Sequence, residues 1–413
     1  MMNDTRAALF ALAMWGCTAD SAPPLRLATR LAPGDRAIEA ARIEVFSSER
    51  PDLVIDRVPA SRASEPGIDL VRVDGNTFAA ARDRVPLLDL APYLARVDIN
   101  LKSYDSAVAG AFERGRGVYA LPRGASPLVL LFNPALFDSA GIAYPSADWT
   151  WDDFLAAAAI LTRDSNGDGT LDQWGTYFDP HPAIWLAWIW SGGGDVFCAR
   201  DVPRATGCLD SRTTQAAIRW YAAWPNEQRI ARAWTAGSEQ EAFRMFAAGR
   251  VAMITVDHTV VPMLRELETR EGFRFGFAEL PHRDGFAPRT VLRVAAYGIP
   301  APTRRRKLAV QLAAALVDSA AQEATASLGY ELPVVPQVLG ALAARADSLG
   351  CEDVFIGASS HARLPWGISV QKWPLVDALL ERMMVRIASE GGGAAEDVVR
   401  ETARAVDRVQ AER

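Results

Sequence analysis

A run of oxygen-bearing side chains near the middle of the chain has the spacing of a calcium-binding loop. The oxygen donors stand at positions one, three, five and nine of such a loop: Asp164, Asn166, Asp168 and Asp172. Position six is Gly169, as the sharp turn of the loop requires, but position twelve is Gly175, where a glutamate usually completes the shell. Because Asp and Asn also favour tight turns, a structural turn is the alternative. The sequence leaves calcium and a plain turn open, and it indicates no required cofactor.

Residue types that carry out catalysis do not form a recognisable motif elsewhere. The four histidines are scattered, and no pair of them has the helical spacing of a zinc hydrolase. The sequence contains no Gly-x-Ser-x-Gly elbow and no phosphate-binding Gly-x-x-x-x-Gly-Lys-Ser/Thr loop. A net charge of -6 argues against the basic footprint of a nucleic-acid-binding protein. We therefore predict no catalytic residues and no nucleic-acid partner.

The first 17 residues predict an export signal that ends at a lipidated cysteine. Arg6 precedes an apolar run over residues 7–16, which is too short to span a bilayer as a helix. Gly16 and Cys17 resemble the cleavage box of bacterial lipoproteins, in which the cysteine carries lipid and becomes the new N-terminus. A plain signal peptide or a buried helix is the alternative. Residues 18–24 would then form a polar tether, and the lipid would be the only contact with the membrane.

Two further cysteines bracket a short polar loop. Cys198 and Cys208 stand at the ends of this loop, and a disulfide between them is plausible for an exported protein. The alternative is that these two cysteines and Cys351 are three buried thiols. No histidine lies near them in the sequence, so a zinc site is not indicated.

Strands and helices alternate along the rest of the chain. Alternating apolar residues predict strands over 25–29, 54–58 and 68–73, with an amphipathic helix over 38–48. Thr150 and Asp153 have the spacing of a capping box that opens a helix. This order of elements predicts parallel strands joined by helical crossovers, and therefore an α/β fold.

Residues 127–175 carry a series of short motifs in a fixed order. They are Phe132-Asn133, Leu136-Phe137, Ala140-Gly141, Pro145, Thr150-Trp151, Asp153-Phe154, Asp168-Gly169 and Trp174-Gly175. Two later blocks are Glu241-Ala242-Phe243 through Ile254 and Gly329 through Pro333. Together these motifs resemble the signature of family 1 of the bacterial extracellular solute-binding proteins. That family contains the maltose-binding-protein-like receptors of carbohydrate ABC importers.

The resemblance implies an α/β fold of the periplasmic-binding-protein-like type II. Two α/β lobes joined by a hinge would close on a ligand held in the cleft between them. Lobe one would combine residues 25–126 with 297–345, and lobe two residues 127–296 with 346–413. The chain would cross between the lobes near residues 126–128, 294–297 and 345–355.

A sugar presents apolar faces, on which aromatic rings stack, and a rim of hydroxyl groups. The resemblance places four tryptophans near the ligand: Trp185, Trp190, Trp366 and Trp373. Each would be a packing residue in the alternative interpretation.

Polar ligand contacts are expected from loops at the carboxyl ends of strands, where open α/β sheets bind ligands. Lobe one and its crossings supply Arg30, Asp74, Asn76, Arg123, Ser126 and Tyr297, and lobe two supplies Asp257. Solvated loop residues are the alternative, since exposed polar side chains are common.

Taken together, the resemblance implies an exported, monomeric receptor in the periplasm or on the cell surface. It would capture a mono- or oligosaccharide, or a related polyol, and pass it to the membrane permease subunits of an ABC importer. A secreted carbohydrate-active enzyme or a sensory ligand-binding subunit is the alternative.

Overall fold

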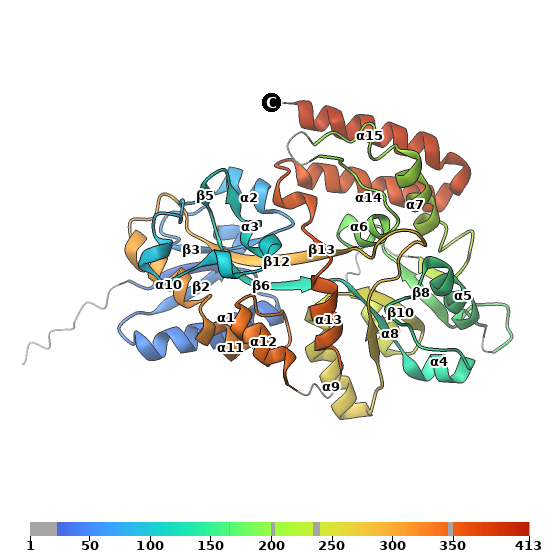
Figure 1. Ribbon diagram of the computed structural model, residues 1–413, viewed down its shortest axis with the longest axis horizontal. Coiled ribbons are helices and arrows are strands. Elements are labelled where there is room, and N and C mark those ends of the chain that lie inside the picture. Colours follow the sequence, from blue (N-terminus) through green and yellow to red (C-terminus); the bar gives the residue numbers. More distant parts are fainter. Residues whose placement is uncertain (1–22, 165, 200–202, 234–239, 346–349, 413) are drawn as a thin grey trace, which may run out of the picture.

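The computed structural model describes residues 23–164, 166–199, 203–233, 240–345 and 350–412, and it contains two large β-sheets, each covered by helices, and one two-stranded sheet (Figure 1). The expected signal with Cys17 and most of the expected tether lie outside the described residues. None of the described helices is both long enough and apolar enough to cross a membrane.

Lobe one is built on the first sheet, whose strands follow the order β13-β12-β3-β1-β2, with β6 paired to β12. Its strands are β1 (Leu25–Thr29), β2 (Ile55–Pro59), β3 (Leu70–Asp74), β6 (Leu121–Pro127), β12 (Thr290–Gly298) and β13 (Ala362–Arg363). Its helices are α1 (Pro33–Glu49), α2 (Phe78–Arg84), α3 (Ser106–Gly110), α10 (Arg306–Ala315), α11 (Ser319–Ala326) and α12 (Pro336–Ala343). The expected parallel pairing is confirmed for β1 with β2 and with β3.

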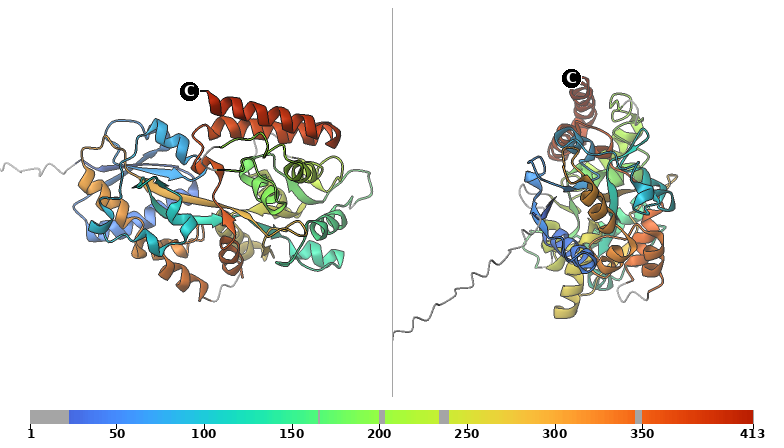
Figure 2. Two further views of the ribbon diagram at one scale, coloured as in Figure 1. Left: turned by 45° about the horizontal axis from the view of Figure 1, so that its top comes forward. Right: turned by 90° about the vertical axis from the view of Figure 1, so that its left-hand side faces the viewer.

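Lobe two is built on the second sheet, which has the order β11-β7-β10-β8-β9. Its strands are β7 (Val129–Phe132), β8 (Trp174–Phe178), β9 (Ala231–Ala233), β10 (Val251–Val256) and β11 (Gly276–Ala278). Its helices are α4 (Pro134–Ala140), α5 (Trp151–Leu161), α6 (Pro182–Ser191), α7 (Arg212–Ala222), α8 (Glu241–Ala247), α9 (Val261–Glu271), α13 (Glu352–Ser359), α14 (Trp373–Glu390) and α15 (Ala395–Ala411). A small hairpin joins β4 (Glu113–Arg114) to β5 (Gly117–Val118). Figure 2 shows α14 and α15 side by side over lobe two, where α14 also packs on α7.

Local signals explain where the helices that position the site begin. The hydroxyl of Thr150 accepts the backbone N–H of Asp153, and the carboxylate of Asp153 accepts the N–H of Thr150. This is the expected capping box, so the predicted start of α5 is confirmed. Asn133 caps α4 with its side chain, and Gly141 ends that helix at a left-handed φ of 67°.

Strands β6 and β12 form the connection between the two halves of the molecule (Figure 1). They pair antiparallel from Pro127 opposite Leu292 to Leu121 opposite Tyr297. Only Leu128 separates β6 of the first sheet from β7 of the second, so the chain passes directly between the sheets at this point. Helix α13 packs against β6, β7 and β12 at the same place. The expected limits of the lobes in the sequence stay a prediction.

Candidate ligand site at the junction of the lobes

The two lobes meet where the loop after β3 packs against the segment before α14. Helix α2, which follows this loop, contacts both the short 3-10 turn Trp366–Ile368 and α14. Gly367 lies so close to both lobes that a Cβ atom there would be 1.6 Å from the carbonyl oxygen of Asn76 and 2.7 Å from Cδ1 of Trp373. Residues expected to bind ligand from different lobes are therefore neighbours. We call this contact between residues 74–78 and 366–373 the lobe junction.

Two polar atoms at the lobe junction have no hydrogen-bond partner among the described residues. One is Nε1 of Trp373, whose side chain is 1 % exposed, and the other is Oδ1 of Asn76. Leaving a buried donor or acceptor unpaired costs about 1–3 kcal/mol, so such atoms are uncommon in folded proteins. The hydroxyl group of a ligand can accept from an indole N–H and donate to an amide oxygen. The two lobes thus supply one unpaired donor and one unpaired acceptor.

Arg30 and Asp74 stand at the carboxyl ends of β1 and β3, as expected. Because these strands are parallel neighbours, both residues lie at one edge of the sheet. Nη1 of Arg30 is 3.7 Å from Oδ2 of Asp74, and Nη1 of Arg72 is 3.5 Å from the same oxygen. The side chains of Arg30 and Asp74 are 58 % and 33 % exposed, so both can reach a ligand from solvent.

A cluster of acidic residues with one histidine lies one turn along α14 from Trp373. Asp179, which follows the carboxyl end of β8, accepts a hydrogen bond from the ring of His181 at 2.6 Å, and this bond raises the pKa of His181. Nε2 of His181 is 3.8 Å from Glu381. Burial and the neighbouring Glu381 raise the pKa of Asp377 to about 6. Sequence reasoning missed this cluster, although Asp179 follows a strand and Trp373, Asp377 and Glu381 share one face of a helix through their spacing of four.

Asp195 fixes the segment that carries Trp366 to the junction. Its Oδ1 atom accepts the indole N–H of Trp190 at 2.8 Å and that of Trp366 at 2.7 Å. Its Oδ2 atom accepts the guanidinium of Arg363 at 2.7 Å. Arg363 in turn lies 4.4 Å from the centre of the Trp190 ring. A single carboxylate thus orders two rings and a cation, and no local sequence pattern indicates this role.

The four tryptophans expected to stack on a ligand are more buried than the prediction assumed. Trp185, Trp190, Trp366 and Trp373 are each at most 3 % exposed and belong to the apolar core of lobe two. Trp185 also donates its indole N–H to the carbonyl of Pro180 at 2.9 Å. Such burial fits the packing alternative, and stacking of a ligand on Trp185 and Trp190 stays a prediction. Ligand contact stays a prediction for Trp366 and Trp373, which lie at the lobe junction.

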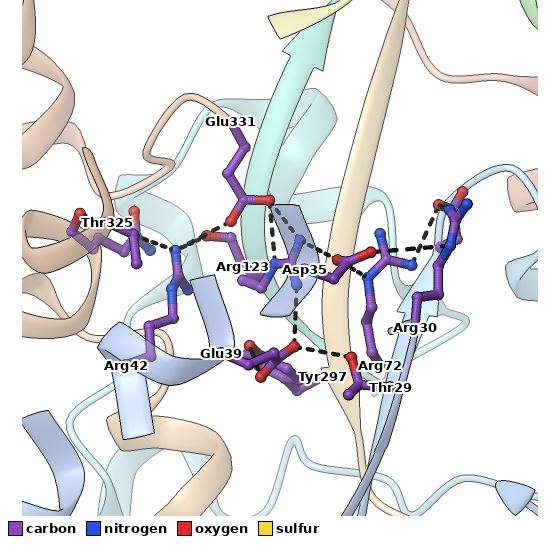
Figure 3. Close-up of polar contacts among 12 residues, drawn as sticks. Thr29, Arg30, Asp35, Glu39, Arg42, Arg72, Arg123, Tyr297, Thr325 and Glu331 are labelled. Atoms are coloured by element: carbon purple, nitrogen blue, oxygen red, sulfur yellow. Dashed lines mark hydrogen bonds and ion pairs between the residues drawn. The ribbon is translucent and has the colours of Figure 1, made fainter. Parts of the chain in front are cut away.

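Arg123 and Tyr297 lie inside lobe one and not at the lobe junction (Figure 3). Three carboxylates surround the guanidinium of Arg123: Glu39 at 3.2 Å, Asp35 at 3.1 Å and Glu331 at 2.8 Å. The hydroxyl of Tyr297 donates to Glu39 at 2.9 Å. Arg123 is 2 % exposed and Tyr297 is fully buried, which favours a structural role for both, and their contact with a ligand stays a prediction.

The charges in this network hold one another in the interior. Burial raises the pKa of Glu39 above its ordinary value, against the opposing effect of Arg123. Burial alone would lower the pKa of Arg123, but Glu331 and the other neighbouring groups raise it well above its ordinary value. Gly124 makes the close approach possible, because a Cβ atom there would lie 2.2 Å from the carboxyl carbon of Glu331. The network joins α1, β6 and the segment before α12 into one rigid unit.

Ser126 lies at the crossing between the lobes and belongs to a buried group of contacts around His258. The backbone N–H of His258 donates to the hydroxyl of Ser126 at 2.7 Å. The ring atom Nδ1 is 2.8 Å from the carbonyl oxygen of Gly329, and Nε2 is 2.8 Å from Glu352. Because a carbonyl oxygen only accepts, Nδ1 carries a hydrogen. We call these four residues the hinge cluster, since they link the end of β10 to the loop before α12 and to α13.

Asp257 precedes His258 and pairs with Arg293 on β12, with Nη1 and Oδ2 2.5 Å apart. Burial alone would raise the pKa of Asp257, but Arg293 and a hydrogen bond from Thr259 bring it below its ordinary value. The carboxylate is therefore charged and engaged in holding the crossing strand. A contact of Ser126 or Asp257 with ligand stays a prediction.

The loop with calcium-like spacing is organised by its own backbone. The two carboxylate oxygens of Asp164 accept the N–H groups of Gly167 and Gly169, each at 2.7 Å. Oδ1 of Asp168 accepts the N–H of Thr170 at 2.7 Å. In the described part of the chain, no three His, Cys, Asp or Glu residues are grouped so that they could hold a metal ion. These bonds fit the structural-turn alternative, and calcium binding by Asp164, Asn166, Asp168 and Asp172 stays a prediction.

Cys198 and Cys208 form a disulfide in the structure, with their Cα atoms 5.5 Å apart. Cys351 is buried at the start of α13.

Solved structures with this fold are similar over nearly the whole chain. A substrate-binding protein of an ABC transporter from Listeria monocytogenes, in complex with cycloalternan, has a TM-score of 0.80 and 19 % identity, covering 94 % of this chain and 99 % of that one. The GacH receptor of Streptomyces glaucescens, solved without ligand and in complex with acarbose, has a TM-score of 0.78 and 16 % identity, with the same coverage of 94 % and 99 %. A Mycobacterium tuberculosis protein in complex with glycerophosphocholine has a TM-score of 0.75 and 19 % identity, covering 94 % and 98 %. At such identities, the likeness shows the fold, which is the periplasmic-binding-protein-like type II fold expected from the sequence.

A comparison with curated proteins of known function gives no match. The family model of the bacterial extracellular solute-binding proteins matches residues 58–323, which is more than half of the chain. The matched region contains the expected motifs from Phe132 to Ile254 and includes strands of both sheets. The chain therefore belongs to the family of bacterial extracellular solute-binding proteins.

Proposed function

We propose that this protein is the receptor subunit of an ABC importer and that it captures a carbohydrate between its two lobes. The observation that carries the proposal is the lobe junction, where an unpaired acceptor on Asn76 and an unpaired donor on Trp373 come from different lobes. A ligand shifts a protein toward the closed state only if it binds that state more tightly than the open one. A hydroxyl-bearing ligand that satisfies both atoms does so, because only the closed state brings both lobes within its reach.

The polar groups around the lobe junction favour a ligand that is rich in hydroxyl groups. Asp179 and Asp377 offer acceptors from lobe two, while Arg30 and Asp74 offer a donor and an acceptor from lobe one. Relatives with this fold were solved with cycloalternan and with acarbose. The relative solved with glycerophosphocholine favours a glycerol-phosphate compound as the second candidate ligand.

A receptor releases its ligand unchanged, whereas the alternative, a carbohydrate-active enzyme, releases a product. We infer that the protein has no catalytic residues, because its family consists of solute-binding proteins. We further propose that the protein is exported as a monomer, is anchored by lipid on Cys17, and delivers its ligand to the permease subunits. Neither a nucleic acid nor a required cofactor is part of this proposal.

Thermal melting of the purified protein with a panel of oligosaccharides, polyols and glycerophosphodiesters tests the proposal. We expect one compound to raise the melting temperature and to be recovered intact, as judged by mass spectrometry. Recovery of a cleaved sugar would show the enzyme alternative instead. Stabilisation by glycerophosphodiesters alone would assign the second candidate ligand.

A further inference from the structure

A cavity lies on lobe two and is formed by other elements than those of the lobe junction. It has a volume of about 250 Å³ and is lined by Thr150, Trp151 and Asp152 at the start of α5, Ala216 and Trp220 on α7, and Arg283 and Asp284 in the loop between β11 and β12. This volume corresponds to about eight water molecules in the liquid, which is enough for one sugar ring.

The aromatic wall of the cavity consists of two stacked indole rings. The centres of the Trp151 and Trp220 rings are 3.8 Å apart, with an angle of 12° between their planes. Trp151 is 5 % exposed, and Trp220 packs further against Trp188 and Trp224. The Nε1 atoms of both Trp151 and Trp220 are buried and have no hydrogen-bond partner among the described residues. Two indole donors beside one cavity are thus unused.

The polar wall has charges of both signs that are not paired with each other. The carboxylates of Asp152 and Asp284 are exposed, and neither has a hydrogen bond or an ion pair within the described ranges. The guanidinium of Arg283 lies 5.5 Å from the centre of the Phe286 ring. The cavity therefore presents two carboxylate acceptors and one guanidinium donor, and both tryptophans that line it carry a buried, unpaired indole N–H.

The walls are held in place before any ligand arrives. The N–H of Trp151 donates to the carbonyl of His282 at 2.9 Å, and the N–H of Arg283 donates to that of Ser191 at 3.1 Å. The ring of Phe286 covers Gly193, where a Cβ atom would lie 2.1 Å from it. These contacts tie the loop to α5 and to the end of α6. A site that is already ordered loses little conformational entropy when it binds.

We infer that this cavity is a second binding site for one pyranose unit of a neutral carbohydrate, separate from the lobe junction. An anion would meet the two carboxylates, and a simple cation would meet Arg283. A neutral polyhydroxyl compound can donate to Asp152 and Asp284 and accept from Arg283, and its apolar face can pack on the partly exposed ring of Trp220. The chemistry of the wall selects this class of ligand over the other two.

Fluorine NMR of the full chain labelled with 5-fluorotryptophan tests this site apart from the lobe junction. Trp151, Trp220 and Trp373 are assigned by single substitution to Phe, and the probes are the methyl glycosides of glucose, galactose and mannose. We expect at least one glycoside to shift the signals of Trp151 and Trp220 with a dissociation constant in the millimolar range, as for small ligands with few contacts. Inorganic phosphate and methylammonium should leave both signals in place.

The double variant Asp152→Asn, Asp284→Asn should weaken this binding at least tenfold. Because both side chains are exposed, the fold should be retained. Asp397→Asn, at an exposed position on α15, is the matched control and should change nothing. A shift confined to Trp373 would overturn the second site and leave the proposed receptor function intact. Binding that survives the double substitution, or that is stronger for phosphate or methylammonium, would also overturn it.

Discussion

Trp373 combines nearly complete burial with an indole N–H that no described residue accepts. Trp185 is equally buried, but its N–H donates to Pro180. Both tryptophans belong to the same apolar core, and they differ in whether the indole N–H has an acceptor. That difference separates a role in packing from a role in binding.

We predict that Trp373→Phe weakens binding of the ligand about two- to tenfold, because it removes one neutral hydrogen bond worth about 0.5–1.5 kcal/mol. Trp185→Phe should leave the affinity unchanged and should lower the free energy of unfolding more than Trp373→Phe does, since it leaves the carbonyl of Pro180 without its donor. Titration calorimetry and urea unfolding of both variants measure the two effects. Equal affinities in the two variants would show that Trp373 serves packing only.

Asp377 makes the stability of lobe two depend on pH. Its folded-state pKa of about 6 lies above its ordinary value of 3.8, so the folded protein binds the proton more tightly than the unfolded chain. The resulting stabilisation is complete below the ordinary value and is lost as the pH rises through about 6. Asp377→Asn lacks this dependence.

From pH 4 to pH 7, the free energy of unfolding of wild type should therefore fall by about 2 kcal/mol relative to that of Asp377→Asn. Urea unfolding across this range measures the difference, and Asp397→Asn should show no such trend. A constant difference over the range would mean that Asp377 is not buried as described.

At the scale of elements, the network around Arg123 holds α1 against β6 and the segment before α12. Removing one member of a buried ion network leaves charges without partners, which costs about 3–5 kcal/mol. We expect Arg123→Ala to lower the free energy of unfolding by that amount. Arg386→Ala, which breaks an exposed pair with Glu390, should cost less than about 1 kcal/mol. Chemical unfolding distinguishes the two, and a small loss for Arg123→Ala would contradict the assignment of this network as structural.

The disulfide between Cys198 and Cys208 closes the loop between α6 and α7, and Cys351 is the other cysteine among the described residues. For a shortened protein that lacks the first 22 residues, we expect one reactive thiol per molecule after unfolding without reductant and three after reduction. Counting thiols with a chromogenic disulfide reagent checks this. Three reactive thiols without reductant would show that the bond does not form.

The sequence predicted those features that depend on neighbours along the chain. The capping box of α5 needs only Thr150 and Asp153, and the parallel pairing of β1, β2 and β3 follows from the order of strands and helices. The ion network of Arg123 could not be predicted, because its partners Glu39 and Glu331 are 84 and 208 residues away. The burial of the four tryptophans could not be predicted, because helical spacing tells which ring shares a face with which, but not whether that face meets solvent. Asp377 was missed because its environment comes from Glu381 and from the distant His181.

The whole molecule consists of two bodies, each built on one of the large sheets. The crossing at Leu128 and the hinge cluster join the two bodies at one side, and the bodies touch at the lobe junction. Helix α2 contacts α14 there, and the amide of Gln371 donates to Asp83 at 3.1 Å. A ligand that bridges the lobes must favour this arrangement over an open one. The lobe junction is thus the place where binding and movement are coupled.

The distance between the lobes, measured by electron–electron double resonance, tests this claim most directly. Spin labels are placed at the exposed positions of Arg84→Cys on α2 and Leu375→Cys on α14, with the carbohydrate identified by thermal melting added to saturation. The account predicts that the carbohydrate shifts the population toward the short distance, and that it does so less at the same concentration in the Trp373→Phe variant. A distance distribution that does not change when the carbohydrate is bound would contradict capture between the lobes.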